Sequence, residues 1–192
     1  MTNYILVLVI MVCAQSYAAG SDARYSKRLQ RLYMSGKRAV CVLKSVNGGN
    51  IEGTVTFYQK TVFDDIEIGA EISGLNPNEQ HGFHVHTYGD LRDKCESTGG
   101  HFNPTNAPHG AFEDEHRHYG DLPMLEADGD GVAQLFVTDH RLNLYGEEGI
   151  LGRSVIVHSH ADDIGEGEAH GSAIHGNAGP RVACCIIGLA PV

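Results

Sequence analysis

The sequence lacks tryptophan, and only 7% of its 192 residues are aromatic. Glycine is abundant, with 24 residues, and neither an internal repeat nor a useful helical period of apolar residues is present. This composition disfavours packed helices and is typical of short strands joined by many turns. The length suits one domain with some residues to spare at an end.

Long apolar runs are also missing. The apolar run at residues 4–13 is too short to span a bilayer, so no membrane span is expected. It is followed by AQSYAAG, whose small residues would permit cleavage after Ala18 or after Gly20. We therefore expect residues 1–18 to be a signal peptide of a secreted, extracellular protein; the alternative is a buried N-terminal strand.

Positive charge is scarce, with 14 basic against 24 acidic residues and a net charge of −10. Six basic residues and Asp22 lie within residues 21–38, so removing this +5 from −10 leaves −15 for the rest. A body this acidic argues against a nucleic-acid partner, which needs a basic surface. We expect residues 19–38 to be a flexible, solvated segment; a removable pro-piece or a contact for anionic surfaces are the alternatives.

Five cysteines are present, of which Cys13 would leave with the signal peptide. In an oxidising compartment the other four predict a disulfide, but the sequence leaves the pairing open. Neighbouring residues of a strand face opposite ways, so only one of Cys184 and Cys185 should reach Cys95.

Apolar segments rich in β-formers alternate with turn signals such as NGGN (47–50) and DGDG (128–131). This pattern predicts an antiparallel all-β sandwich or barrel. Two long polar regions, residues 89–127 and 159–181, interrupt it, and loops of this length in a compact domain are usually functional. The expected strands are residues 39–44, 53–59, 66–72, 82–88, 132–138, 154–158 and 182–190.

The stretch HGFHVHTYGD (81–90) places His84 and His86 on either side of Val85. In a strand, residues two apart share one face, so both imidazoles aim at one point. The simplest shared target is a metal ion, although such a pair taken alone is more often an ordinary pair of core or surface histidines.

More candidate ligands follow in the two long regions. Three imidazoles and one carboxylate, from His101, His109, His118 and Asp121, make up a four-ligand set of the kind that zinc takes. His84, His86 and His158 with one further imidazole would form an all-nitrogen set, which suits copper.

These stretches together resemble the Cu/Zn superoxide dismutase family in its secreted form. The resemblance runs from about residue 39 to residue 190 and implies a domain over 39–192 with an eight-stranded Greek-key β-barrel or sandwich. The motifs that carry it are GFHVHTYGD (82–90), GGHFNPTNAPHG (99–110), HRHYGDL (116–122), GRSVIVHSHADDIG (152–165) and GNAGPRVAC (176–184).

The resemblance implies an enzyme that converts superoxide to O2 and H2O2 with one copper and one zinc ion per chain, copper doing the redox work. The implied copper ligands are His84, His86, His101 and His158, and the implied zinc ligands are His101, His109, His118 and Asp121. His101 would bridge both metals and supply a proton, and Arg181 would attract the anion.

Supporting roles also follow from the resemblance. Asp162 would link His84 to His109, and His81 would be a structural histidine. Cys95 and Cys184 would form the internal disulfide, which leaves Cys185 free or available for an intermolecular bond. A homodimer is the family default, through apolar residues that correspond to Tyr88, Leu151, Ile187 and Leu189.

The sequence leaves two rival functions open. One is a copper-binding or copper-delivering protein without turnover, and the other is a structural β-sandwich with incidental histidines. The chain also departs from the family at positions that usually carry steering lysines or small residues. The departures are His160, Glu166, Ile174, His175, Pro180 and Cys185.

Overall fold

The computed structural model describes residues 27, 29 and 33–192. The expected signal peptide, residues 1–18, and most of the basic segment lie outside the described residues. Among the residues that are described, no helix combines the length and apolar character that crossing a membrane requires.

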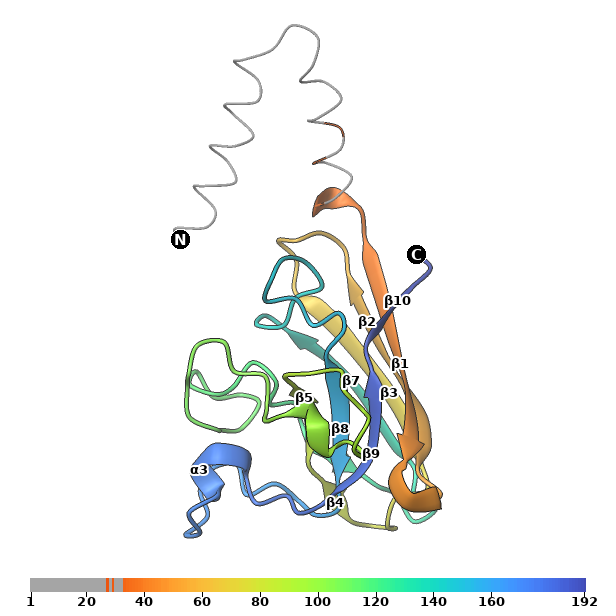
Figure 1. Cartoon of the computed structure of the whole chain (residues 1–192), viewed down its shortest axis with the longest axis vertical. Helices are drawn as coiled ribbons and strands as arrows, with labels where there is room; N and C mark the ends of the chain where they lie inside the picture. The colour runs from red at the N-terminus through yellow and green to blue at the C-terminus, as the bar shows by residue number, and fades with distance from the viewer. Residues whose placement is uncertain (1–26, 28, 30–32) are drawn as a thin grey trace, which may run out of the picture.

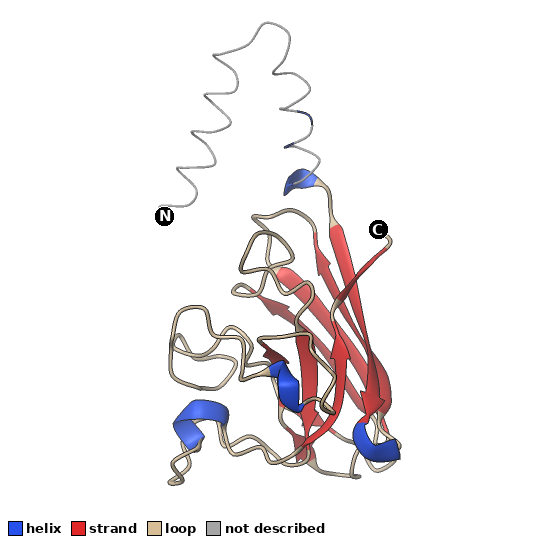
Figure 2. Cartoon of the chain, in the orientation of Figure 1, coloured by secondary structure: helices blue, strands red, loops and turns tan. Residues whose placement is uncertain are grey.

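The predicted all-β fold is confirmed. One curled antiparallel sheet of eight strands forms the body, and Figure 2 shows that helices are few and short. Along this sheet the strand order is β5-β8-β9-β1-β2-β3-β7, with β10 also paired to β1, while β4 and β6 form a separate two-stranded sheet (Figure 1). The strands are β1 (Lys37–Ser45), β2 (Glu52–Gln59), β3 (Ile66–Ser73), β4 (Gln80–His81), β5 (Phe83–His86), β6 (Leu125–Glu126), β7 (Ala133–Asp139), β8 (Ser154–His158), β9 (Arg181–Ile186) and β10 (Gly188–Ala190). The short helices are η1 (Val46–Gly48), η2 (Glu96–Thr98) and α3 (Ser172–His175).

The chain crosses between the two edges of the sheet. After β3 it passes to β5 at the far edge, returns to pair β7 beside β3, and crosses again to pair β8 beside β5. Such crossings between non-sequential neighbours are the mark of a Greek-key connection.

The core follows from the alternation of apolar residues. In β1, Ala39, Cys41 and Leu43 point inward and are at most 2% exposed, while their neighbours face outward. In β3 the same period of two buries Ile66, Ile68 and Ile72. These one-sided strands are expected where a sheet packs one face on a core and leaves the other to solvent.

Strands β5 and β8 differ because every residue in them is buried. Their inner faces contribute core residues such as Val85 and Val157. The other face of β5 carries His84 and His86, which are 1% exposed. Two long connections bury this face, and we call them the first loop (87–124) and the second loop (159–180).

The predicted strand at 182–190 is interrupted in the structure. Ile187 leaves the ladder, donating its N–H to Arg153 and accepting from Gly152, so β9 and β10 are separate strands. Strand β1 begins at Lys37, inside the expected basic segment, and the ring of Tyr33 stacks on Tyr145 with 6.5 Å between centroids.

Candidate metal centre

Strand β5 is the backbone of the site. On one side it pairs with β8, which brings His84 opposite Ile156 and His86 opposite Ser154. On its free side the first loop continues the pairing, through isolated bridges between His84 and Asp121 and between His86 and His101. The loop residues His101 and Asp121 are therefore fixed beside the β5 histidines by backbone hydrogen bonds.

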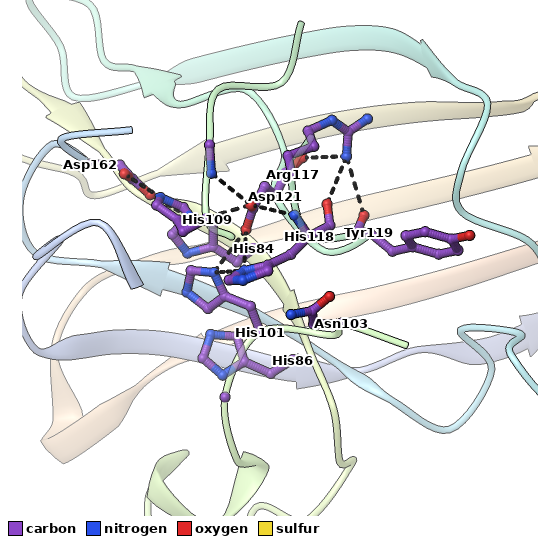
Figure 3. A network of polar contacts seen from close by, with 12 residues as sticks. His84, His86, His101, Asn103, His109, Arg117, His118, Tyr119, Asp121 and Asp162 are labelled. Atoms are coloured by element: carbon purple, nitrogen blue, oxygen red, sulfur yellow. Dashed lines mark hydrogen bonds and ion pairs between the residues drawn. The ribbon is translucent and has the colours of Figure 1, made fainter. Parts of the chain in front are cut away.

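Four buried imidazoles converge as the first cluster. One ligand atom from each of His84, His86, His101 and His158 lies within 4.8 Å of every other. In Figure 3 the rings of His84, His86 and His101 lie side by side, and the His84 and His101 centroids are 3.9 Å apart.

The free nitrogens of this cluster show that it suits a metal. Within the described residues, His84 Nδ1 and the Nε2 atoms of His86, His101 and His158 are buried without a hydrogen-bond partner. The Nδ1 atoms of His86 and His158 instead donate to the carbonyls of Gly99 at 2.9 Å and Gly179 at 2.8 Å. A neutral ring that donates a hydrogen bond from one nitrogen keeps a lone pair on the other. These unpartnered nitrogens are therefore free to coordinate a metal ion.

The second cluster gathers three imidazoles around a carboxylate. Asp121 Oδ1 lies 2.8 Å from His101 Nδ1 and 3.2 Å from His118 Nδ1, and Oδ2 lies 3.0 Å from His109 Nδ1. All four ligand atoms are within 4.8 Å of one another. His101 belongs to both clusters, with Nδ1 facing the second and Nε2 facing the first.

Asp162 joins the clusters from outside. Its Oδ2 accepts from His84 Nε2 at 2.6 Å and its Oδ1 accepts from His109 Nε2 at 2.8 Å. The segment is packed so closely that a Cβ at Gly176, where φ is +65°, would stand 1.8 Å from Asp162 Oδ1. The carboxylate thus fixes the tautomer and orientation of two rings, the usual role of such partners around a metal.

Electrostatics keep the imidazoles of the first cluster neutral and the carboxylate of the second cluster charged. Burial, followed by the neighbouring imidazoles, lowers the pKa of His84 and His86 well below the usual range, and burial lowers that of His158 to about 4. Burial raises the pKa of Asp121, but its hydrogen bonds with His101, His109 and His118 outweigh that and bring it well below normal. Neutral imidazole and ionised carboxylate are the forms that bind metal ions.

Arg181, at the start of β9, is held by the first loop. Its Nη1 donates to the carbonyl of Cys95 at 2.6 Å and to Thr98 Oγ1 at 2.8 Å, and its Nη2 donates to the carbonyl of Gly99 at 2.7 Å. His86 Nδ1 donates to that same Gly99 carbonyl. One short segment thus orients both the arginine and a histidine of the first cluster.

Two disulfides are present among the described residues. Cys95 is bonded to Cys184, and Cys41 is bonded to Cys185. The expectation that Cys185 is free or available for an intermolecular bond is therefore wrong. Cys185 faces the main core with Cys41, whereas Cys184 faces the first loop, because adjacent residues of β9 point in opposite directions.

Other expected residues lie as follows. His81 is buried and its Nδ1 donates to the carbonyl of His158 at 2.8 Å. Tyr88 and Leu189 are 60% and 69% exposed, but Ile187, expected on the same surface, is 1% exposed. Its neighbour Ile186 faces outward instead, at 46%. The departures His160, Glu166, Ile174 and His175 are all exposed on the second loop.

Sequence reasoning missed a buried ion pair behind the second cluster. Arg117 and Asp139 are both 0% exposed, with Arg117 Nη2 2.5 Å from Asp139 Oδ2. Arginine is rarely buried completely, so no sequence signal marks this one apart from its place between His116 and His118.

Comparisons with known proteins agree with this geometry. The sequence model described as copper/zinc superoxide dismutase (SODC) matches residues 51–187. A Cu-Zn superoxide dismutase from Candida glabrata is 45% identical over 152 residues, which cover 79% of this chain and 97% of the relative. The chain therefore belongs to the copper/zinc superoxide dismutase family.

Proposed function

We propose that the two clusters divide the metals between them. The all-imidazole cluster of His84, His86, His101 and His158 holds copper, because copper favours nitrogen ligands. The cluster of His101, His109, His118 and Asp121 holds zinc, which takes such mixed sets of imidazole and carboxylate. The observation that carries the assignment is the set of four buried, unpartnered nitrogens in the first cluster.

The enzyme dismutates superoxide: two superoxide anions and two protons give one O2 and one H2O2. Copper, when bound, supplies the one-electron redox chemistry that this reaction needs, while zinc has no redox chemistry. The chain has to attract an anion, exclude competing ligands and deliver protons.

Arg181 attracts and orients the anion. Its guanidinium always carries a positive charge, and the three carbonyls and one hydroxyl that it contacts fix its plane. His101 delivers a proton, since its Nε2 is buried, unpartnered and directed at the first cluster while its Nδ1 contacts Asp121. A positioned imidazole that holds and then releases a proton acts as a general acid.

Two measurements distinguish turnover from the rival functions. Metal analysis of the purified mature chain should find copper and zinc in equal amounts, and superoxide should be consumed with formation of peroxide. A copper-delivery protein would bind copper without turnover, and an adhesive sandwich would bind neither metal in fixed amount.

We also propose a secreted homodimer. Tyr88, Ile186 and Leu189 form exposed apolar surface on the first loop, β9 and β10, and a second copy would cover them. The two disulfides support an oxidising compartment, and residues 1–18 would direct the chain there. N-terminal sequencing of the exported protein tests the cleavage site.

A further inference from the structure

The first loop contains a segment, residues 112–121, that has almost no regular structure yet carries His118 and Asp121. Arg117 lies at its centre and is completely buried. Its guanidinium donates to the carbonyls of Phe112 at 2.7 Å, His118 at 3.0 Å and Asp121 at 3.0 Å. Figure 3 shows Arg117 beside His118 and Asp121. The side chain therefore draws the segment into a closed turn around one cation.

Asp139, the last residue of β7, anchors this cation. Its Oδ2 pairs with Arg117, and its Oδ1 accepts the backbone N–H groups of Arg141 at 2.6 Å and Leu142 at 2.7 Å. Both carboxylate oxygens of Asp139 are thereby engaged, one by Arg117 and one by the turn that follows β7. A buried charge pair of this kind is stable only where its remaining hydrogen-bonding groups are also satisfied, as they are here.

A second arginine grips the same segment from outside. Arg141 Nη1 donates to the carbonyl of Arg117 at 3.3 Å, and its Nη2 donates to the carbonyls of Asp114 at 3.1 Å and of Glu115. Two guanidinium groups thus hold the segment on both sides. That of Arg117 pairs with the Asp139 carboxylate, and Arg141 is tied to the same carboxylate through its backbone N–H. The carbonyls that accept from the two guanidinium groups belong to Phe112, Asp114, Glu115, Arg117, His118, Tyr119 and Asp121.

We propose that Arg117 and Arg141, organised by Asp139, are positioning residues that hold His118 and Asp121 in their metal-ready arrangement before zinc arrives. This inference rests on the proposed zinc site. We call Arg117, Arg141 and Asp139 the clamp. Every donor in it comes from the protein, so its hydrogen bonds can form before the ion binds. Ordering the segment during folding means that metal binding does not have to order it, which is the general advantage of preorganisation.

The test uses the full mature chain, freed of metal by chelation. Arg141→Leu removes the outer guanidinium at a half-buried position, and Arg141→Lys restores one donor. Arg92→Gln is the matched control, because Arg92 pairs with Asp90 on the surface with a side chain that is 90% exposed. Asp139→Asn tests the anchor, and thermal unfolding of each variant reports whether the fold is kept.

Amide hydrogen exchange across residues 112–121 of the metal-free protein is the first readout. We expect exchange there to rise in Arg141→Leu and to return partly in Arg141→Lys, with β1–β3 unchanged. The second readout is zinc affinity, measured by competition with a chelator. It should fall about 10–100-fold in Arg141→Leu, which is the usual effect of losing a group that orients metal ligands. The third is the visible spectrum of Co²⁺ bound in place of zinc, which should change in Arg141→Leu and not in Arg92→Gln.

Unchanged exchange and unchanged zinc affinity in both Arg141→Leu and Asp139→Asn would overturn the clamp. The zinc assignment is tested separately, by whether His118→Gln abolishes zinc binding. If the wild-type protein held no zinc at His118, the proposed zinc site would be wrong. Hydrogen exchange in the metal-free chain would still test whether Arg141 and Asp139 order residues 112–121.

Discussion

Arg181 donates from Nη1 to the carbonyl oxygen of Cys95 at 2.6 Å. Cys95 is in turn bonded to Cys184, three residues beyond Arg181 on the same strand. The disulfide, the loop backbone and the arginine therefore form one closed connection. The carbonyl that orients the Arg181 guanidinium is therefore fixed to β9 by a covalent bond.

Replacing Arg181 by glutamine should slow the reaction about tenfold, because a local positive charge offsets the acidity of the rest of the chain. The variant should also lose most of the decrease in rate that added salt causes, since salt screens an attraction that is no longer present. Arg181→Lys keeps the positive charge but loses the planar guanidinium, so its rate should lie between those of the wild type and Arg181→Gln. Pulse radiolysis across ionic strength measures both effects, and an unchanged rate in Arg181→Gln would refute the steering role.

The two clusters should separate by mutation. His84→Gln should abolish copper binding and activity while zinc content stays at the wild-type level, because His84 belongs only to the first cluster. His118→Gln should empty the zinc site and loosen the first loop, which zinc would otherwise close. Metal analysis of each purified variant decides, and full activity in His84→Gln would make the copper assignment wrong.

Zinc binding should release protons. In the metal-free protein burial lowers the pKa of His109, but the carboxylates of Asp121 and Asp162 outweigh this and raise it to about 9. Near neutral pH the ring is thus protonated, and a metal can take Nδ1 only when that proton leaves, while Nε2 continues to donate to Asp162.

Apparent zinc affinity should accordingly rise with pH and level off above about 9, where this group no longer holds the proton. Calorimetric titration in buffers of different protonation enthalpy counts the protons released. An affinity that does not change between about pH 6 and pH 9 would contradict the competition between proton and metal at His109.

The two disulfides should differ in what they support. Each closes a long loop, of 144 residues for Cys41–Cys185 and 89 for Cys95–Cys184. Removing either pair as a double alanine variant should lower the free energy of unfolding by about 2–5 kcal/mol. Only loss of Cys95–Cys184 should also slow turnover by the folded enzyme, because only Cys95 contacts Arg181. Chemical denaturation and rate measurements on both variants, side by side, test the difference.

The exposed apolar surface should form the dimer contact. Leu189→Glu is expected to shift the protein toward monomer in sedimentation velocity, because a charge at the centre of an apolar interface is left unpaired. Phe136→Glu is the control, since Phe136 is 74% exposed on β7, outside the proposed contact. Equal dissociation in both variants, or in neither, would show that this surface is not the interface.

Much of the fold could be predicted from alternation alone. The strand expected at 66–72 was found at Ile66–Ser73, because a one-sided core imposes a period of two on the sequence. The strand expected at 154–158 was found at Ser154–His158, where every residue is buried and the signal is instead the run of β-branched residues. The break at Ile187 could not be predicted, since it depends on hydrogen bonds to Arg153 and Gly152 that lie far away in the sequence.

The candidate site shows the same division. The spacing of His84 and His86 predicted a shared target because strand geometry is local. The partner of Cys185 was missed because Cys41 lies 144 residues away and only the sheet brings β1 and β9 together. Arg117 was missed because its burial depends on a counter-charge at the end of β7, and the sequence does not show which carboxylate that is.

Adjacent Cys184 and Cys185 face opposite sides of β9, and each has a partner on its own side. A slip of β9 by one residue would exchange the two sides, presenting Cys184 to Cys41 and Cys185 to Cys95. Correct oxidation therefore requires a correctly aligned strand. A chain oxidised with the strand out of register would carry crossed bonds, and thiol–disulfide exchange would be needed before it could reach the native pairing.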